Sequence, residues 1–519
     1  MDFWLILISI LCIGASIFSL WINSKGTSKN LPPSPPTLPI VGNFLLLLKS
    51  SNNFSSLKPL LRQLSSKYGP IITLYLGSRP SIFITSRETA HQALVRSGST
   101  FASRPPAMET SRIIFTNQNT VATSPYNPIW RVLRHNFMSL THPSRLHLYS
   151  DCRRWAAKVL IEKIAATTIG AGDGDGDGKK AIHIVNHFQH AFFCLLTYMC
   201  FGEKLDEELL VDIERTQRAT IGNFIRFNVL NFMPKLTRIL FRNLWIELLE
   251  IRHGLDVTLL PLIKSRQEQS KERDSEVVSD PPKWYLDTIL ELQVPGEGRK
   301  FTDFELISLC SEFLNSGTDT TVTTLQWVMA NLVKHQRIQK ILQREIDSVV
   351  QPGNEIQEED LKEMPYLKAV ILETLRRHPP GHFILPRAVT EDTKLGGYDI
   401  PKSAIINVTV ADMGRDPQVW EDPMEFKPER FLGDGVDGKM EEFDFKGVKG
   451  IKMMPFGAGR RVCPAITVAI LHLEWFVANL VREFEWQAEE GVEVDLSEKQ
   501  DFTTGMRNPL KVVVTPRIS

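Results

Sequence analysis

The feature that most constrains this chain is a cysteine, Cys463, set between a glycine-containing loop and a long apolar segment. Residues 456–465 read Phe-Gly-Ala-Gly-Arg-Arg-Val-Cys-Pro-Ala, and residues 466–481 are mostly apolar. Pro464 suits the first position of a helix, because its ring fixes φ and its missing N–H would have no partner there. We therefore expect Cys463 at a helix N-terminus, where backbone N–H groups and the helix dipole favour a thiolate.

The loop before the cysteine suits a flat, negatively charged ligand. Gly457 and Gly459 carry no side chain, so the loop can lie against a large planar group. Arg461 can neutralise a nearby anion. A thiolate, a flat ligand and a cation describe one face of a haem whose iron is bound by sulfur. A lone unpaired cysteine is more often a small buried hydrophobe, but Phe456, Gly459 and Arg461 together favour Cys463 as an iron ligand.

This segment resembles the cysteine loop of the cytochrome P450 superfamily, Phe-x-x-Gly-x-Arg-x-Cys-x-Gly. The resemblance implies that Cys463 ligates the iron of haem b, iron protoporphyrin IX, and that Phe456 and Arg461 bind this cofactor. Ala465 stands where the family usually has glycine. We expect its extra methyl group to shift packing beneath the porphyrin slightly and to leave ligation intact.

A second motif lies in the middle of a long helix predicted over 302–335, which opens with a capping box from Thr302 to Glu305. Residues 316–321, Ser-Gly-Thr-Asp-Thr-Thr, resemble the family's distal motif Ala/Gly-Gly-x-Asp/Glu-Thr-Thr. The glycine inside the helix costs about 1 kcal/mol relative to alanine, and room for a ligand beside the backbone would explain it.

The distal motif carries the expected catalytic residues. The resemblance implies that Asp319 and Thr320 deliver protons to dioxygen bound at the iron. Ser316 replaces the usual Ala or Gly and adds a hydroxyl near the expected substrate face. Taken alone, Asp-Thr-Thr is more often a solvated helix face than a site.

Charged residues elsewhere match supporting positions of the family. Glu373 and Arg376 share a helix face at i, i+3 spacing, and Arg430 lies in Pro-Glu-Arg-Phe at 428–431. Most such pairs are solvated and contribute little. The resemblance implies instead a buried cluster of these three residues that holds the scaffold of the cysteine loop.

Three cations are expected to meet the two haem propionates. Trp130 and Arg134 are four residues apart and resemble the family's Trp-x-x-x-Arg. Arg387 matches another propionate-binding position, as does Arg461. Charge-assisted hydrogen bonds from arginine suit carboxylates.

Composition excludes several other classes of protein. Lys+Arg and Asp+Glu balance at 60 each, so no nucleic-acid partner is expected. The six cysteines are scattered without a Cys-x-x-Cys pair, which argues against a disulfide framework and structural zinc.

The N-terminus predicts a single-pass membrane anchor over residues 1–24. Residues 3–22 carry no charge, and Lys25 and Lys29 follow them. Such a segment can span a bilayer, with the body of the protein on the cytosolic side of the endoplasmic reticulum membrane. A cleaved secretory signal is the alternative, but the basic n-region is missing. A basic, proline-rich hinge at 25–40 should lead into a haem-thiolate monooxygenase domain at 41–519.

The remaining pattern predicts a mainly α fold with a minor β region, the cytochrome P450 fold. Helices are expected at 183–201, 302–335 and 365–377. Strands are expected at 71–76 and 81–85, joined as a hairpin through residues 77–80, and within 397–410. The polar stretches 170–180 and 266–282 should be exposed connections.

The motifs occur in the family's order along the whole chain. The sequences at residues 311–315 and 325–327 resemble those of plant microsomal A-type members, nearest the 89 family. The resemblance implies a monooxygenase that inserts one oxygen atom from O2 into a small apolar plant metabolite. Electrons would come from NADPH through NADPH–cytochrome P450 reductase, with cytochrome b5 as a further partner. A haem-thiolate isomerase or dehydratase acting without O2, and a non-catalytic haem-binding protein, are the alternatives. The Asp319–Thr320 pair favours turnover with O2.

Overall fold

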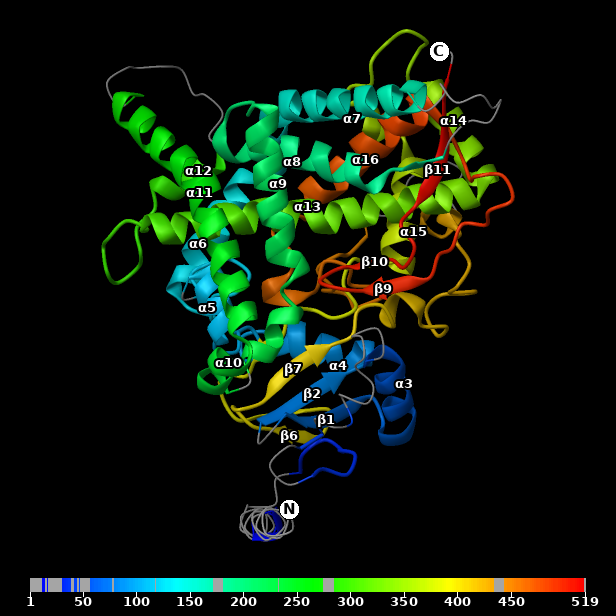
Figure 1. Ribbon diagram of the computed structural model, residues 1–519. Coiled ribbons are helices and arrows are strands. Elements are labelled where there is room, and N and C mark those ends of the chain that lie inside the picture. Colours follow the sequence, from blue (N-terminus) through cyan, green and yellow to red (C-terminus); the bar gives the residue numbers. More distant parts are fainter. Residues whose placement is uncertain are drawn as a thin grey trace, which may run out of the picture. The chain divides into compact units, whose positions relative to one another are not determined.

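The computed structural model describes residues 12–14, 16, 30–38, 42–43, 46, 57–76, 79–116, 118–170, 181–231, 233–273, 284–433 and 443–517 (Figure 1). The chain divides into two compact units. The sheet unit comprises 1–105, 382–420 and 444–462, and the helical unit comprises 106–381, 421–443 and 463–519.

The sheet unit is built on four strands in the order β1-β2-β7-β4. Strand β1 (Ile71–Leu76) pairs antiparallel with β2 (Arg79–Ile84), as the expected hairpin. Strand β2 runs parallel to β7 (Ile405–Val408), which pairs antiparallel with β4 (Arg387–Ala388). The unit's other elements are α3 (Leu57–Tyr68), α4 (Arg87–His91), η2 (Gln92–Arg96), β5 (Thr393–Leu395), β6 (Tyr398–Ile400), η6 (Met413–Arg415) and η8 (Gly459–Arg461).

Both faces of this sheet are apolar, because successive side chains of a strand point to opposite sides. On one face Ile82 and Ile406 pack in a buried cluster with Leu94 of η2. On the other face Ile72 and Phe83, which are partners in the β1–β2 register, pack with α3. These two clusters hold the helices of the unit against the sheet.

Helix α13 (Asp303–Lys334) is the central element of the helical unit and is buried along most of its length. Figure 1 shows α8 and α16 on one side of α13 and the β9–β10 hairpin on the other. The helices of this unit are α5 (Glu109–Phe115), α6 (Pro128–Leu140), η3 (Pro143–Tyr149), α7 (Ser150–Gly170), α8 (Val185–Phe201), α9 (Glu207–Gly222), η4 (Arg226–Asn231), α10 (Pro234–Leu240), α11 (Arg242–Arg273), α12 (Tyr285–Leu290), α13, α14 (Gln336–Val349), η5 (Asp360–Glu363), α15 (Pro365–Arg377), η7 (Pro428–Phe431) and α16 (Ile466–Glu483). Its strands are β3 (Ile182–His183), β8 (Phe484–Gln487) and β11 (Lys511–Pro516) in one sheet, and β9 (Glu498–Gln500) with β10 (Thr504–Met506) in another.

The predicted helices are confirmed with small changes at their ends. The helix expected from residue 183 begins at Val185, because residues 182–183 pair as β3 with β11. Helix α13 has the expected capping box: Glu305 N–H donates to the Thr302 hydroxyl, and Thr302 N–H donates to Glu305 Oε2 over 2.8 Å.

The expected exposed connection at 266–282 is wrong for its first part. Helix α11 continues to Arg273, and Arg266 is buried. Its guanidinium makes two 2.6 Å hydrogen bonds to the carboxylate of Asp287 on α12. A buried arginine is tolerated when such a bidentate partner is present, and the sequence of α11 alone does not reveal that partner.

Two sequence predictions fall mainly outside the described residues. The segment 3–22 is described only at 12–14 and 16, and the Gly/Asp tract is described only at Gly170. Within the described ranges, no helix combines the length and apolar character needed to cross a bilayer. Of the proline-rich segment, Pro32 and Pro33 are tied to β1, because Thr73 Oγ1 and Thr73 N–H donate to their carbonyl groups over 2.9 and 2.8 Å.

Candidate haem-thiolate site

The structure places Cys463 just before α16, in the helical unit. Ala465 is the N-cap of α16, so Pro464 precedes the helix and does not occupy its first turn as expected. The Ala465 N–H nevertheless points at the sulfur, with 3.4 Å between N and Sγ. Burial raises the pKa of the Cys463 thiol and outweighs the opposing effects of this N–H and of Arg134. The helix end alone therefore does not lower the pKa of this thiol, and a metal ion bound to the sulfur would favour the thiolate.

Trp130 and Arg134 lie on α6, whose N-terminus is fixed by Asn127. The Asn127 side chain accepts the Trp130 N–H over 2.9 Å, and Pro128 occupies the first turn. The Arg134 guanidinium lies 5.5 Å from the centre of the Trp130 ring. Burial lowers the pKa of Arg134, and the Cys463 sulfur acts to raise it. The fold thus brings Arg134 into electrostatic contact with a cysteine that is remote in the sequence.

Phe456, Arg387 and Arg461 belong to the sheet unit. Arg387 and Arg461 are buried, and Arg461 Nε donates to the Ala102 carbonyl over 2.8 Å. Phe456 packs edge-on against Phe445, with 5.2 Å between ring centres. Arg461 is thus held in place by its own unit.

The two loop glycines have different roles. Both have positive φ, 71° at Gly457 and 68° at Gly459. A Cβ on Gly459 would lie 1.8 Å from the carbonyl oxygen of Leu94, so this glycine is required for close packing on η2. A Cβ on Gly457 would meet only Ile384 Cγ2, at 3.9 Å. The Gly457 backbone is therefore the more open of the two, and its role against a flat ligand stays a prediction.

These residues fit a sulfur-ligated haem. A free cysteine with an N–H donor at its sulfur is a suitable thiolate ligand for iron. Arg134 supplies a half-buried cation in the same unit as Cys463. The open backbone at Gly457 suits the approach of a planar group.

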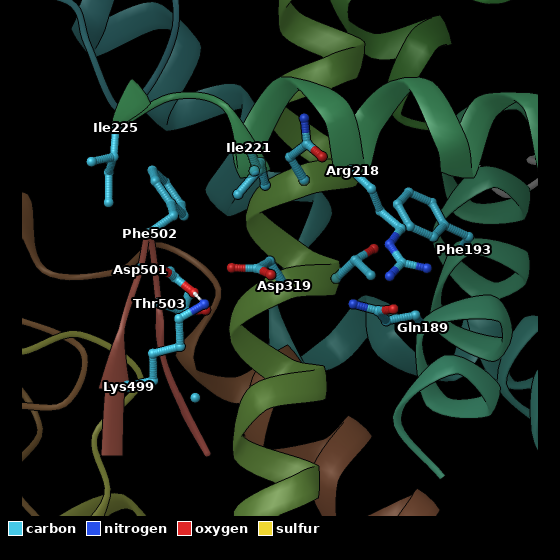
Figure 2. A pocket seen from close by; sticks show the side chains of 14 residues that line it. Gln189, Phe193, Arg218, Ile221, Ile225, Asp319, Lys499, Asp501, Phe502 and Thr503 are labelled. Atoms are coloured by element: carbon cyan, nitrogen blue, oxygen red, sulfur yellow. Dashed lines mark ion pairs between the residues drawn. The ribbon is translucent and has the colours of Figure 1, made fainter. Parts of the chain in front are cut away.

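The distal motif lies on α13, where Asp319 and Thr320 point in different directions. Thr320 Oγ1 donates to the Ser316 carbonyl over 2.7 Å, and Ser316 Oγ donates to the Glu312 carbonyl over 2.6 Å. Ser316 is exposed in the described structure. The Asp319 side chain instead borders a cavity with a volume of about 440 Å³ (Figure 2).

The glycine of this motif has a packing role that sequence reasoning missed. A Cβ on Gly317 would lie 2.7 Å from Leu196 Cδ1 on α8. The expected explanation was room for a ligand, but the described contact is between two helices.

The cavity at Asp319 is lined by residues of α8, α9, the turn after α9, α13 and the β9–β10 hairpin, all in the helical unit: Gln189, Phe193, Arg218, Ile221, Gly222, Ile225, Asn315, Thr318, Asp319, Lys499, Asp501, Phe502, Thr503 and Gly505. Burial raises the pKa of Asp319, as does the nearby charge of Asp501. A hydrogen bond with Thr503 and the charge of Arg218 oppose this increase. Arg218, Asp501 and Thr503 were not predicted, because no motif marks them and they meet Asp319 only in the folded chain.

Glu373, Arg376 and Arg430 form a hydrogen-bonded cluster. The carboxylate of Glu373 accepts two 2.7 Å bonds from Arg376, and both side chains are fully buried. Arg430 Nε donates to Glu373 Oε1 over 3.2 Å, and Lys427 N–H donates to the same oxygen over 2.8 Å. Arg376 also donates to the carbonyls of Pro423 and Glu425, so α15 is tied to the segment around 423–430.

The fold and this set of side chains define a haem-thiolate protein. The family model "Cytochrome P450" matches residues 32–515. Cytochrome P450 89A9 of Arabidopsis thaliana is 45% identical, with 97% of this chain and 96% of that protein covered. The (+)-menthofuran synthase of Mentha piperita is 31% identical, with 97% of each chain covered.

Solved structures agree with this result at the level of the fold. A zebra fish cytochrome P450 solved with abiraterone has a TM-score of 0.72 and 24% identity, covering 88% of this chain and 99% of that one. The chain therefore belongs to the cytochrome P450 family, whose members bind haem through a cysteine thiolate. It is a P450 monooxygenase.

Proposed function

We propose that Cys463 is the axial ligand of haem b and that the enzyme inserts one oxygen atom from O2 into a small apolar metabolite. The observation that carries this assignment is the sulfur of Cys463, which accepts an N–H from Ala465 and interacts with Arg134. Bound haem supplies the activation of dioxygen and the transfer of its oxygen atom.

The chain's own residues bind the cofactor and move protons. We assign haem binding to five residues: Trp130 and Arg134 of the helical unit, and Arg387, Phe456 and Arg461 of the sheet unit. The arginines bind the haem propionates. Asp319 holds a proton at its carboxylate, and Thr320 passes protons on by giving up its bond to the Ser316 carbonyl.

The Glu373–Arg376–Arg430 cluster has a structural role in this proposal. Its hydrogen bonds to residues 421–427 hold that part of the helical unit in one conformation. The cluster thereby supports haem retention and takes no part in the chemistry.

Family membership and the N-terminal sequence support the proposed electron donor and location. Electrons come from NADPH through NADPH–cytochrome P450 reductase, with cytochrome b5 as a second partner. Residues 1–24 anchor the protein by a single pass in the endoplasmic reticulum membrane, with the domain at 41–519 in the cytosol.

A small apolar metabolite of plant secondary metabolism is the proposed substrate class. Plant relatives include a 3-beta-hydroxylase of Tanacetum parthenium and costunolide synthase of Cichorium intybus. Pockets for such molecules are mostly apolar, with a few polar groups that orient the ligand.

A reduced, carbon monoxide difference spectrum of membranes that contain the full chain tests the ligand assignment. We expect the strongly red-shifted Soret band of thiolate-ligated haem, and its loss in Cys463→Ala. Cys194→Ala is the matched control, because Cys194 is a buried free cysteine of the same unit. A normal band in Cys463→Ala would exclude this residue as the ligand.

A further inference from the structure

Three helices of the helical unit meet at His190, a buried histidine on α8. Figure 1 shows α8 near α7 and α9, and both helices pack against it. The side chain of His190 is only 9% exposed. Charged side chains reach it from both neighbouring helices: Lys163 from α7, and Glu207 and Glu214 from α9. A buried histidine with charged partners on two other helices can link their attachment to pH.

Both imidazole nitrogens of His190 face a charged group. Lys163 Nζ lies 2.9 Å from Nε2, and Glu207 Oε2 lies 3.5 Å from the same nitrogen. Glu214 Oε2 lies 3.4 Å from Nδ1. An ammonium group can only donate hydrogen bonds, so its contact with Nε2 requires that this nitrogen carries no proton. The partners therefore assign a neutral imidazole with its proton on Nδ1, toward Glu214.

Lys163 is itself held by Glu207. Its Nζ lies 2.6 Å from Glu207 Oε1, and this hydrogen bond lowers the pKa of the Glu207 carboxyl group. Because Glu207 is in the first turn of α9, the lysine ties α7 to the start of that helix. The side chain of Lys163 is 40% exposed, so it can leave the histidine and enter water.

Other titratable groups also face this cluster. Cys194 Sγ lies 3.6 Å from His190 Nε2, but burial raises the pKa of the thiol to about 12, so it stays neutral. Burial lowers the pKa of His187, one turn earlier on α8, so it stays neutral near pH 7. Arg218 contacts Glu214 through Oε1, the oxygen that does not face the histidine, over 3.2 Å. Among these described groups, the lysine of α7 is the cation placed at Nε2.

We propose that His190 is a pH-dependent switch in which a proton and Lys163 compete for Nε2. When the imidazole is neutral, it accepts the lysine, and α9 is tied to α7. When a proton from water binds Nε2, two positively charged donors would face each other, so the ammonium group moves out into solvent. The imidazolium then pairs with Glu207 and Glu214, and α9 is tied to α8 instead. The exchange moves one proton and no electron.

The switch bears on the candidate site because α9 forms part of the cavity wall at Asp319. Arg218 and Ile221 lie on α9 and line this cavity. Arg218 also shares the carboxylate of Glu214 with His190. The inference goes beyond the proposed function, because it concerns how pH changes the attachment of α9 and not the chemistry at the iron.

Histidine titration of the haem-loaded full chain, reduced and bound to carbon monoxide, tests the competition. The NMR signals of His190, assigned by their loss in His190→Gln, are followed between about pH 5 and 8. Lys163→Met should raise the titration midpoint, because it removes a like charge and leaves both carboxylates, and Glu214→Gln should lower it. Lys158→Met is the matched control, because Lys158 is an exposed lysine of α7 whose partner is Glu162. An unchanged midpoint in Lys163→Met would overturn the proposal.

Crystal structures on either side of the measured midpoint show the movement itself. Above the midpoint, Lys163 Nζ should lie within hydrogen-bond distance of His190 Nε2, as it does here. Below the midpoint, the lysine should point into solvent while Glu207 and Glu214 contact the imidazolium. A lysine still seated on Nε2 below the midpoint would reject the switch.

Thermal unfolding gives a check in solution. Lys163→Met should lower the unfolding temperature above the midpoint and should have a smaller effect below it, because the lysine contact is then already lost. In a His190→Gln background the effect should be the same at both pH values, since the amide oxygen accepts from the lysine and does not titrate. Equal effects of Lys163→Met at both pH values in the unmodified background would contradict the proposal.

Discussion

The side chain of Leu196 on α8 lies against the backbone of α13 at Gly317, so closely that an added Cβ would come within 2.7 Å of Leu196 Cδ1. The Leu196 methyl group occupies the space that a side chain at position 317 would need.

Gly317→Ala is therefore expected to destabilise the fold even though alanine is the better helix former. Overpacking costs about 1–3 kcal/mol, against a gain of up to about 1 kcal/mol in helix propensity. Denaturant unfolding followed by haem absorbance measures the change. Gly222→Ala is the control, because a Cβ there meets no atom within 4 Å. The Gly317→Ala effect should be smaller in a Leu196→Ala background, and equal effects in both backgrounds would contradict the contact.

Glu373→Gln should remove much of the stability and haem content of the enzyme. The substitution leaves Arg376 buried without its carboxylate partner, and breaking a buried pair costs about 3–5 kcal/mol. The yield of haem-loaded protein and its unfolding midpoint report the loss. Glu425→Gln changes a largely exposed carboxylate nearby and should leave both quantities unchanged.

The depressed pKa of Glu305 should make the free energy of unfolding depend on pH. Burial alone would raise its pKa, but hydrogen bonds from Arg299, Thr302 and Asn119 lower the pKa from 4.5 to about 2. Because the folded-state pKa is depressed, the stabilisation is complete well above pH 4.5 and is lost as the pH falls toward 2. It should amount to about 2–3 kcal/mol at neutral pH.

The test compares the protein with Glu305→Gln over a pH series. The stability difference between them should be largest at pH 7 and should shrink as the pH falls below about 4.5. A difference that is constant with pH would mean that the charge of Glu305 does not contribute.

Thr320→Ala should keep the haem-thiolate spectrum and divert electrons from product to hydrogen peroxide. Its hydroxyl lies on α13 with a carbonyl as its described partner, so the change removes a proton donor without opening the helix ladder. Thr324→Ala is matched, because Thr324 makes the same kind of bond to the Thr320 carbonyl one turn later. Peroxide and product are quantified per NADPH consumed, and unchanged coupling in Thr320→Ala would remove Thr320 from the relay.

The sequence by itself determined the elements whose signals are local. The capping box at Thr302 and Glu305 predicted where α13 begins, and the apolar period predicted α15 at 365–377. The alternation of apolar residues predicted the β1–β2 hairpin. These signals succeed because caps, turns and hydrophobic periods depend on residues within a few positions of one another.

Only the tertiary structure decided which distant residues meet. Three features bring together separate helices or a hairpin. They are the salt bridge of the buried Arg266, the close approach at Gly317, and the cavity that both Asp319 and Asp501 line. No local pattern encodes these contacts, because they follow from packing geometry and from the burial of charge, which arise once the chain is folded.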